Sequence, residues 1–410
     1  MNELSQTRIF REKPRDSRKY WSIIIMIVLA ILFGYILFAI SRNIPASIQS
    51  ADIEQNLGQT NLVWPNQGSA AVGVVNNGTV ICRSYGPNVP QPTASIAKVI
   101  TALVVLEKYP LQIGAQGPDI VMQKSDVDLY NQTVAAGGSN LPISLEEKLT
   151  EREILEGMMI VSSDNMADSL ANWAFGDFAN YKIAAQTFLE KNHLNSTNIG
   201  DDASGLDPAT TSNSSDLCQL MNLALKNPTL ISIMSTTSID NFANSGAITN
   251  TNQTLGRAGI FAGKTGSLGT GFYNLLTASR SLIDGKSVTT INVVMGQNNF
   301  SSLFSATEKL SSSVIENLGL RKISRNQVVG IAKNPDGSSV ELIAQSGLSI
   351  ATFKDQQADL KLVLSAKNLP LRQGTVVGKI TDKITGQSVN IITKNSLARP
   401  QIGWLLAHPF

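Results

Sequence analysis

The chain has 410 residues, of which 42% are hydrophobic and 16% charged, a composition typical of a globular protein with room for more than one domain. Its formal net charge is +2 and no basic stripe with interleaved aromatic residues occurs, so nothing in the composition indicates a nucleic-acid partner. Only two histidines, His193 and His408, are present, which excludes a histidine-rich metal site and makes lysine the favoured candidate for a catalytic base.

The N-terminal segment predicts a membrane anchor. Residues 1–19 are polar and basic, and residues 20–40 contain no charged residue. An apolar helix of that length spans the hydrocarbon core of a bilayer, about 30 Å thick. The basic flank keeps the N-terminus in the cytoplasm, so we expect the rest of the chain on the extracytoplasmic side. A cleaved signal peptide is the alternative, although its apolar region is usually about 7–15 residues long. Residues 41–62 resemble a polar tether.

The folded part is expected to begin with a β-hairpin, because two apolar runs flank Asn76-Asn77-Gly78, and these residues tolerate the positive φ of a tight turn. An apolar helix then begins near Ser95 and carries Lys98. Three residues are close to one helical turn, so the Lys98 amine returns to the face that holds the Ser95 hydroxyl. A desolvated lysine near positive groups can take a serine proton. We interpret Ser95 as a nucleophile and Lys98 as its base.

A polar cluster, Ser162-Ser163-Asp164-Asn165, separates two further helices. Thr150 and Glu153 form a capping-box pattern at the start of the first, and the second is expected at residues 166–174. A turn between helices with an N-cap accounts for such a cluster as well as a functional site does.

The segment Gly263-Lys264-Thr265-Gly266-Ser267 precedes two predicted strands, which we expect to turn at Gly285-Lys286 at the edge of an antiparallel sheet. Glycine at such a strand marks either an ordinary strand end or the close approach of a ligand. A helix at residues 303–318 would cover the sheet. From residue 321 onward, short alternating runs predict a small all-β domain without reactive groups.

The two cysteines, Cys82 and Cys218, are too few and too far apart for a metal-ligand spacing. They pair if the compartment is oxidising, or they remain buried thiols.

Three motifs occur in order: Ser-x-x-Lys at Ser95, Ser-x-Asn at Ser163 and Lys-Thr-Gly at Lys264. With them the chain resembles the D-alanyl-D-alanine carboxypeptidases of the low-molecular-weight penicillin-binding proteins, serine peptidase family S11, over residues 70–318. Residues 202–208 and the C-terminal module are also similar. The second motif permits two registers. We assign the motif to Ser163 and Asn165, since Ser-Asp-Asn occurs in the wider superfamily. If the motif instead begins one residue earlier, Ser162 is its serine and Asp164 stands in place of the asparagine.

The resemblance implies a mixed α+β fold of the β-lactamase/transpeptidase type at residues 63–320, with an antiparallel sheet between helical layers, followed by a small all-β domain at residues 321–410. The site would lie between the sheet and the helices. The resemblance also implies catalytic roles for Ser95, Lys98 and Ser163, and no metal or cofactor. It implies that the substrate is bound by Asn165, Lys264, Thr265, Gly266 and Ser267, with the backbone N–H groups of Ser95 and Ser267 as the oxyanion hole.

The activity implied is removal of the terminal D-alanine from peptidoglycan stem peptides at a bacterial membrane, with β-lactams as inhibitors. A class A-like β-lactamase, a D,D-endopeptidase or transpeptidase, and an inactive wall-binding scaffold are the alternatives. Class A enzymes use a glutamate between the second and third motifs to activate water. Only Glu190 lies there, inside a predicted helix, so we expect penicillin to leave slowly. Intact Ser95, Lys98 and Lys264 argue against the scaffold.

Overall fold

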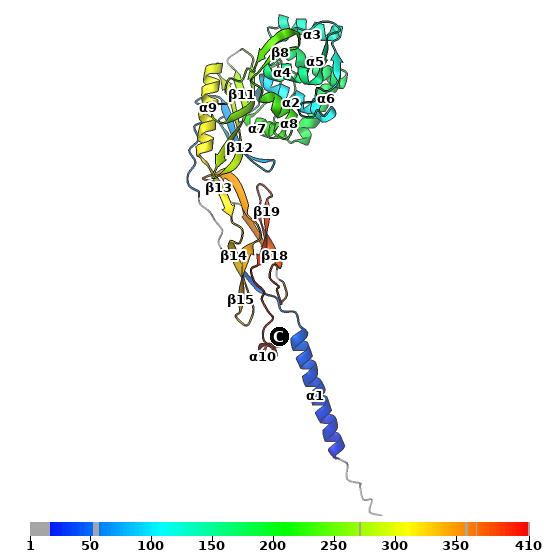
Figure 1. Ribbon diagram of the computed structural model, residues 1–410, viewed down its shortest axis with the longest axis vertical. Helices are drawn as coiled ribbons and strands as arrows, with labels where there is room; N and C mark the ends of the chain where they lie inside the picture. Colours follow the sequence, from blue (N-terminus) through cyan, green and yellow to red (C-terminus); the bar gives the residue numbers. More distant parts are fainter. Residues whose placement is uncertain (1–16, 52–56, 270–271, 357–359, 366, 409–410) are drawn as a thin grey trace, which may run out of the picture.

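The computed structural model describes residues 17–51, 57–269, 272–356, 360–365 and 367–408. A five-stranded antiparallel sheet forms the centre of its upper part, in the order β10-β11-β12-β2-β3 (Figure 1). The strands are β2 (Ser69–Asn76), β3 (Thr79–Tyr85), β10 (Ile260–Ser267), β11 (Tyr273–Ile283) and β12 (Lys286–Gln297). The predicted hairpin is confirmed, since Asn77 and Gly78 take positive φ values of 49° and 79° between β2 and β3.

The expected turn between β11 and β12 needs correction. The turn consists of Asp284 and Gly285, with φ values of 47° and 79°, and Lys286 already belongs to β12. The hairpin also lies inside the sheet, because β12 pairs with β2, from the N-terminal part of the chain. A pairing between segments so far apart in sequence leaves no trace in the local pattern of either strand.

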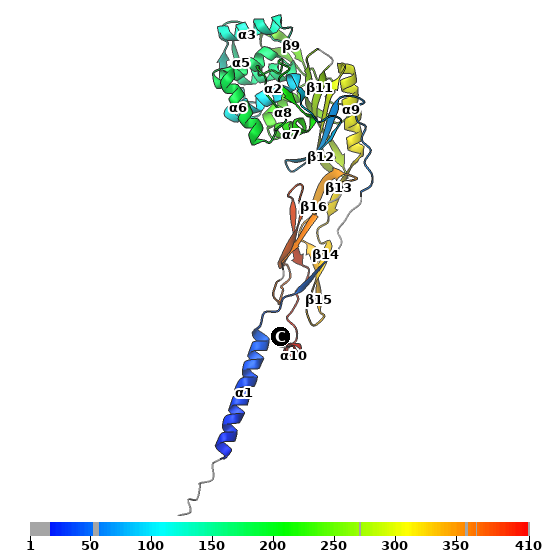
Figure 2. The same cartoon turned by 180° about the vertical axis from the view of Figure 1, so that it is seen from behind.

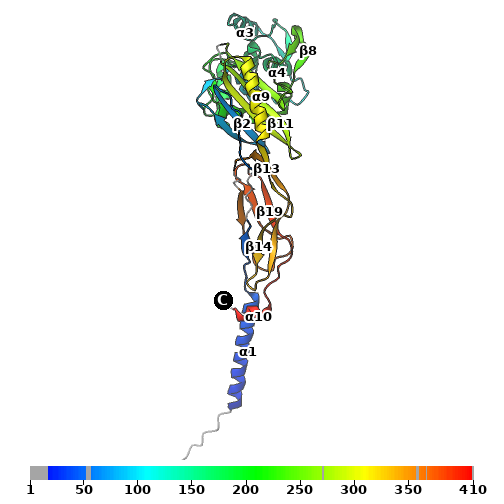
Figure 3. The ribbon, with the colours of Figure 1, turned by 90° about the vertical axis from the view of Figure 1, so that its left-hand side faces the viewer.

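Helices cover both faces of the sheet (Figures 1 and 3). One face of β2 packs in the core under α9 (Phe300–Glu316) with Ala70, Val72 and Val74. Ala71, on the opposite face, packs in the core beneath the other helices. This alternation follows from the two-residue period of a strand. The helical side contains α2 (Ala97–Lys108), α3 (Lys124–Ala135), α4 (Glu151–Ile160), α5 (Asp164–Phe175), α6 (Phe178–Lys191), α7 (Ser214–Ala224) and α8 (Pro228–Met234). The sheet therefore lies between helical layers, as expected for the mixed α+β class.

Short elements connect these layers. The 3-10 helix η1 (Ala94–Ile96) precedes α2, and a second one, η2, spans Ala243–Ser245. Three two-stranded pairs join β4 (Gln91–Pro92) to β7 (Thr211–Ser212), β5 (Asp119–Val121) to β6 (Lys148–Thr150), and β8 (Ser238–Phe242) to β9 (Gly246–Thr249). The predicted capping box is confirmed at α4, where the Thr150 and Glu153 side chains each accept a hydrogen bond from the other residue's backbone N–H.

A disulfide joins Cys82 on β3 to Cys218 on α7, which resolves the two alternatives for the cysteines. Gly73 on β2 makes room for it, because a Cβ atom at Gly73 would lie 2.7 Å from the Cys218 sulfur. The bond fixes the helical layer to the outer strand of the sheet.

The lower part is an all-β module with the strand order β1-β14-β15-β19-β18-β17 (Figure 3). Its strands are β1 (Ser47–Ser50), β14 (Val328–Lys333), β15 (Ser339–Ala344), β17 (Leu360–Leu364), β18 (Val376–Asp382) and β19 (Ser388–Thr393). The prediction of a tether at residues 41–62 is partly wrong, because β1 lies within this segment and pairs with β14. Ser47-Ile48-Gln49-Ser50 has little strand character alone and becomes a strand by completing the β14 edge.

A further pair, β13 (Leu318–Ile323) and β16 (Leu348–Phe353), lies between the two parts. Leu318, Leu320 and Phe353 from this pair belong to the core under α9. We propose that the catalytic domain ends near residue 320, with this pair connecting it to the all-β module.

The N-terminal helix α1 (Ser17–Ser41) extends away from the lower module (Figure 2). Within the described residues it is the one helix long and apolar enough to cross a membrane, over Arg18–Ser41. The short C-terminal helix α10 (Ile402–Ala407) lies beside the C-terminal end of α1, nearest the all-β module (Figure 2), where Arg399 donates a hydrogen bond to the Arg42 carbonyl at 2.6 Å. The basic tail expected at residues 1–19 lies mostly outside the described residues.

Candidate active site

The structure places Ser95 and Lys98 together at the start of α2. Ser95 is part of η1 and partly exposed, whereas the Lys98 side chain is fully buried. The Lys98 Nζ lies 2.7 Å from the Ser95 Oγ. Ala94, just before the serine, has a φ of 49°, a left-handed conformation that is costly for a residue with a Cβ atom. Such strain is typical of functional sites.

The edge strand β10 supplies the third motif. Lys264 is buried, and its Nζ donates to the Ser162 Oγ at 2.9 Å and to the Thr265 carbonyl at 3.0 Å. Burial, followed by repulsion from Lys98, lowers the pKa of Lys264 well below its usual value. Both of these acceptors are neutral oxygen atoms, so among the described residues no carboxylate is hydrogen-bonded to Lys264, and its N–H donors suit an anionic group of a ligand.

Gly266 brings β10 against the serine. A Cβ atom at this position would lie 2.5 Å from the Thr93 carbonyl oxygen and 3.2 Å from the Ile96 nitrogen. Only glycine allows this approach. Asn274 holds the same junction from β11 by donating to the carbonyls of Pro92 and Thr93 at 3.0 and 3.3 Å. Thr265 and Ser267 flank Gly266 on β10, and the Thr265 hydroxyl lies 2.6 Å from that of Thr251.

The assignment of Ser163 and Asn165 to the site does not fit the structure. Both side chains are fully buried, and the Ser163 hydroxyl donates to the Asn165 Oδ1 at 2.8 Å. The Asn165 amide in turn pairs with the backbone of Leu141, accepting from its N–H and donating to its carbonyl, each at 3.1 Å. These two residues therefore hold the loop around Leu141 in place.

The other register, with Ser162 and Asp164, places side chains at the two lysines. Ser162 has a φ of 70°, and its Oγ accepts from Lys264, while the Asp164 Oδ1 accepts from Lys98 at 2.5 Å. With this left-handed conformation at Ser162, the side chains that contact the two lysines lie one residue earlier than in our assignment. The second motif is thus read as Ser162-Ser163-Asp164, with an aspartate at its third position.

The loop at residues 202–207 closes the site behind Lys98. The Asp202 carboxylate accepts hydrogen bonds from the backbone N–H groups of Ser204, Gly205 and Leu206 at 2.7, 2.5 and 3.2 Å. In this conformation of the loop, the Ser204 carbonyl accepts a hydrogen bond from Lys98 Nζ at 3.0 Å. Gly205, with a φ of 80°, packs against Ala94, since a Cβ atom there would lie 2.2 Å from the Ala94 carbonyl oxygen.

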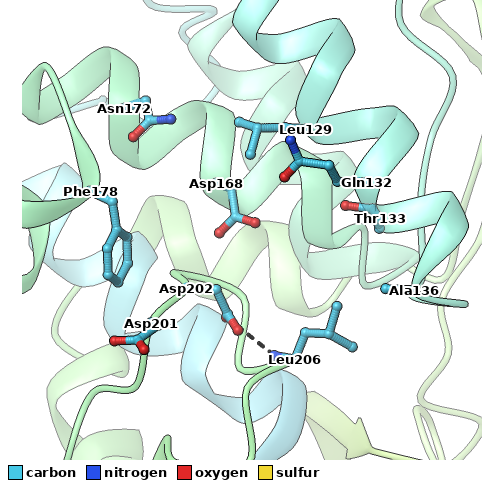
Figure 4. Close-up of a pocket in the computed structure, with 10 residues that line it drawn as sticks. All are labelled: Leu129, Gln132, Thr133, Ala136, Asp168, Asn172, Phe178, Asp201, Asp202 and Leu206. Carbon is cyan, nitrogen blue, oxygen red and sulfur yellow. Dashed lines mark hydrogen bonds between the residues drawn. The ribbon is translucent and has the colours of Figure 1, made fainter.

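A cavity of about 300 Å³ lies behind this loop, between α3, α5 and α6 (Figure 4). Asp168, Asp201 and Asp202 line it together with apolar residues, and the Asp168 Oδ1 accepts from the Ala203 N–H at 2.8 Å. Burial, followed by repulsion from Asp202, raises the pKa of Asp168 to about 7. In the part of the chain that the structure describes, no group of three or more His, Cys, Asp or Glu side chains is arranged to hold a metal ion.

Sequence reasoning missed several contributors to this site. Ser162 and Asp164 were visible only as the alternative register. The Ser204 carbonyl lies in the segment 202–208, which the family resemblance already singled out. No local sequence pattern indicated that residues 138–141 belong to the site, although Gly138 packs against the Asp164 carboxylate and Leu141 is hydrogen-bonded to Asn165.

An antiparallel sheet between helical layers, with a serine, a lysine three residues on and a buried lysine on the edge strand, defines a serine hydrolase of the penicillin-binding class. A family model described as D-alanyl-D-alanine carboxypeptidase, Peptidase S11, matches residues 66–299. This is more than half of the chain, and the chain belongs to that family.

The chain is similar to a known protein by sequence and to solved structures by fold. A D-alanyl-D-alanine endopeptidase of Escherichia coli K12 is 29% identical over 174 residues, which are 42% of this chain and 52% of the relative, so the chain matches about half of that protein's length. The structure of penicillin-binding protein 5 from Haemophilus influenzae has a TM-score of 0.60 at 20% identity and covers 83% of this chain and 99% of its own. PBP3 from Streptococcus pneumoniae has a TM-score of 0.62 at 20% identity, covering 82% and 100%. These structures show the shared fold.

Proposed function

We propose that the protein is a serine-type D-Ala-D-Ala carboxypeptidase, which removes the terminal D-alanine of peptidoglycan stem peptides through an acyl-enzyme on Ser95. The observation that carries the proposal is the 2.7 Å contact between Lys98 Nζ and Ser95 Oγ, with the buried Lys264 on the adjacent edge strand. Membership of the S11 family supports the same reaction class.

Each residue has a separate role in this reaction. The Ser95 oxygen attacks the carbonyl carbon of the penultimate D-alanine as its proton passes to Lys98. The backbone N–H groups of Ser95 and Ser267 stabilise the oxyanion, each donor contributing on the order of 3 kcal/mol. Lys264 and the Thr265 hydroxyl bind the substrate's terminal carboxylate. Ser162 delivers a proton to the departing amine, and water then hydrolyses the ester.

Anchoring by α1 completes the proposal. Its length and apolar surface suit a bilayer, and we propose that it remains attached, with the catalytic domain on the extracytoplasmic face of a bacterial membrane. Protease added to intact cells should remove the catalytic domain while a tag at residue 1 stays protected. A protected catalytic domain would refute this topology, and recovery of the chain shortened by the helix would show a cleaved signal.

An endopeptidase that cuts cross-links between stem peptides is the second candidate, because the curated relative has that activity. It would use the same residues on a larger substrate. A β-lactamase is less well supported, since Glu190 is exposed at the end of α6, and an inactive scaffold is disfavoured by the intact contact between Ser95 and Lys98.

Product analysis tests the proposal. The full chain in detergent, with Ser95→Ala beside it, is incubated with a peptide ending in D-Ala-D-Ala and with a cross-linked dimer of stem peptides. Release of free D-alanine that requires Ser95 supports the carboxypeptidase. Cleavage of the dimer alone would make the protein an endopeptidase, and the absence of both products from folded protein would refute the peptidase assignment.

A further inference from the structure

Among the described residues Lys98 has three hydrogen-bond partners, and they differ in whether they can accept a proton. Its Nζ contacts the Ser95 Oγ at 2.7 Å, the Asp164 Oδ1 at 2.5 Å and the Ser204 carbonyl oxygen at 3.0 Å. A backbone carbonyl only accepts a hydrogen bond. Apart from the serine itself, the Asp164 carboxylate is therefore the one contact of Nζ in the described part of the chain that can bind a proton.

The pair lies out of solvent, with side-chain exposures of 0% for Lys98 and 5% for Asp164. A buried carboxylate beside a neutral amine would remain an uncompensated charge, which costs several kcal/mol. In the ion pair that these two side chains form, the three N–H donors of Lys98 match its three hydrogen-bond partners. An ammonium has no lone pair and cannot take the Ser95 proton unless it passes one on.

We propose that Asp164 is the final proton acceptor behind Lys98, so that Ser95, Lys98 and Asp164 act as a relay. This inference rests on the proposed function. As the Ser95 oxygen bonds to the substrate carbonyl, its proton moves to Nζ while one Nζ proton moves to the Asp164 Oδ1. The lysine stays an ammonium and the carboxylate becomes a carboxylic acid. When the bond to the leaving amine breaks, the Ser162 hydroxyl gives its proton to that amine, and the proton held by Asp164 returns through Lys98 to replace it.

The surroundings hold Asp164 in this position. Its backbone N–H donates to the Ser139 carbonyl at 2.6 Å, and a Cβ atom at Gly138 would lie 2.6 Å from its Oδ2. Glycine at 138 thus admits the carboxylate. The charged groups acting on the pair are Lys264 from β10 and Asp168 one helical turn further along α5, while Asp202 from the loop acts on Asp168.

The relay is tested with Asp164→Asn in the full chain, because asparagine keeps the shape and one acceptor oxygen but cannot take the proton. We expect the rate of penicillin acylation and of D-alanine release to fall about 100-fold or more at pH 7, within the range of general acid-base effects, with a changed acid limb of the pH–rate profile. The matched control is Asp168→Asn, which retains its contact with Ala203 and should stay within about threefold of the wild-type rate.

Several outcomes would overturn the relay. Equal or faster acylation by Asp164→Asn from pH 5 to 9 shows that Lys98 acts alone, while the wild type still confirms the proposed function. An inactive wild type overturns both. If Asp164→Asn does not fold, Gly138→Ala decides the matter: its Cβ displaces the carboxylate, so acylation should fall at least tenfold, and an unchanged rate refutes the relay.

Discussion

Ser162 and Ser163 are neighbours with opposite surroundings. The first accepts a hydrogen bond from Lys264, and the second is enclosed with Asn165 under the loop around Leu141. A sequence motif cannot distinguish them, because the choice depends on the left-handed φ of Ser162, a conformation that serine has no local tendency to adopt. At this scale the sequence predicted the chemistry but not the register.

The two serines therefore give a matched pair of variants. We expect Ser162→Ala to lower D-alanine release about 100-fold with little change in thermal stability, since it removes a proton donor from the site. Ser163→Ala should keep activity within about threefold and cost about 1 kcal/mol of unfolding free energy, since it removes one buried hydrogen bond. Rates and thermal unfolding of both variants check this. A larger loss of activity in Ser163→Ala would restore the original register.

Glu151 gives a prediction about pH. Burial raises the pKa of this carboxyl to about 7 from its usual 4.5, and among the described residues its Oε1 has no hydrogen-bond partner. The folded state therefore binds the proton more tightly than the unfolded state. Ionised Glu151 therefore lowers the free energy of unfolding. This effect is absent below pH 4.5, grows between pH 4.5 and 7, and above that range reaches its full size, on the order of 2–3 kcal/mol.

Glu151→Gln should remove this dependence. The variant should unfold at a higher temperature than the wild type at pH 8, and the difference should vanish near pH 4. Thermal unfolding of both proteins between pH 4 and 8.5 measures it. A constant difference across that range would contradict the assigned pKa.

At the scale of elements, the site depends on how closely β10 approaches η1. Gly266 sets that distance, as no side chain fits between it and the Thr93 carbonyl. Gly266→Ala should separate strand and serine, lower penicillin acylation at least tenfold and destabilise the fold by about 1–3 kcal/mol. The control Gly347→Ala meets only ordinary contacts, at 3.6 Å or more, and should change neither quantity. Normal acylation by Gly266→Ala would show that the junction tolerates movement.

Elements with strong local signals were predicted well. The hairpin at Asn77-Gly78, the capping box at Thr150 and the apolar helix after Ser95 each depend on residues within a few positions of one another. The strand β1 was missed, because it exists only through pairing with β14. The placement of β12 in the middle of the sheet was missed for the same reason: long-range pairing is a property of the whole fold.

The whole molecule extends from α1 through the all-β module to the catalytic part (Figure 1), and the disulfide is the covalent link within the upper part. Such bonds persist in oxidising compartments, which agrees with the proposed extracytoplasmic location. Cys82 and Cys218 lie 136 residues apart. Closing so long a loop stabilises the fold by about 2–5 kcal/mol.

Removing the bond should therefore lower the melting temperature. For the double variant Cys82→Ala, Cys218→Ala we expect a decrease of about 5–15 °C, measured by thermal unfolding. Reductant should shift the wild type toward the variant and leave the variant unchanged. A wild type insensitive to reductant under unfolding conditions would show that the bond does not form.

Mass spectrometry of the penicillin-treated protein tests the central claim most directly. Opening of the β-lactam ring transfers the whole drug to the nucleophile, so we predict one adduct of the full penicillin mass, located on the peptide that contains Ser95 and absent from Ser95→Ala. The adduct should persist, because Glu190, the one glutamate between the second and third motifs, is exposed at the end of α6. An adduct on another residue, or none on folded protein, would contradict the assignment of Ser95 as the nucleophile.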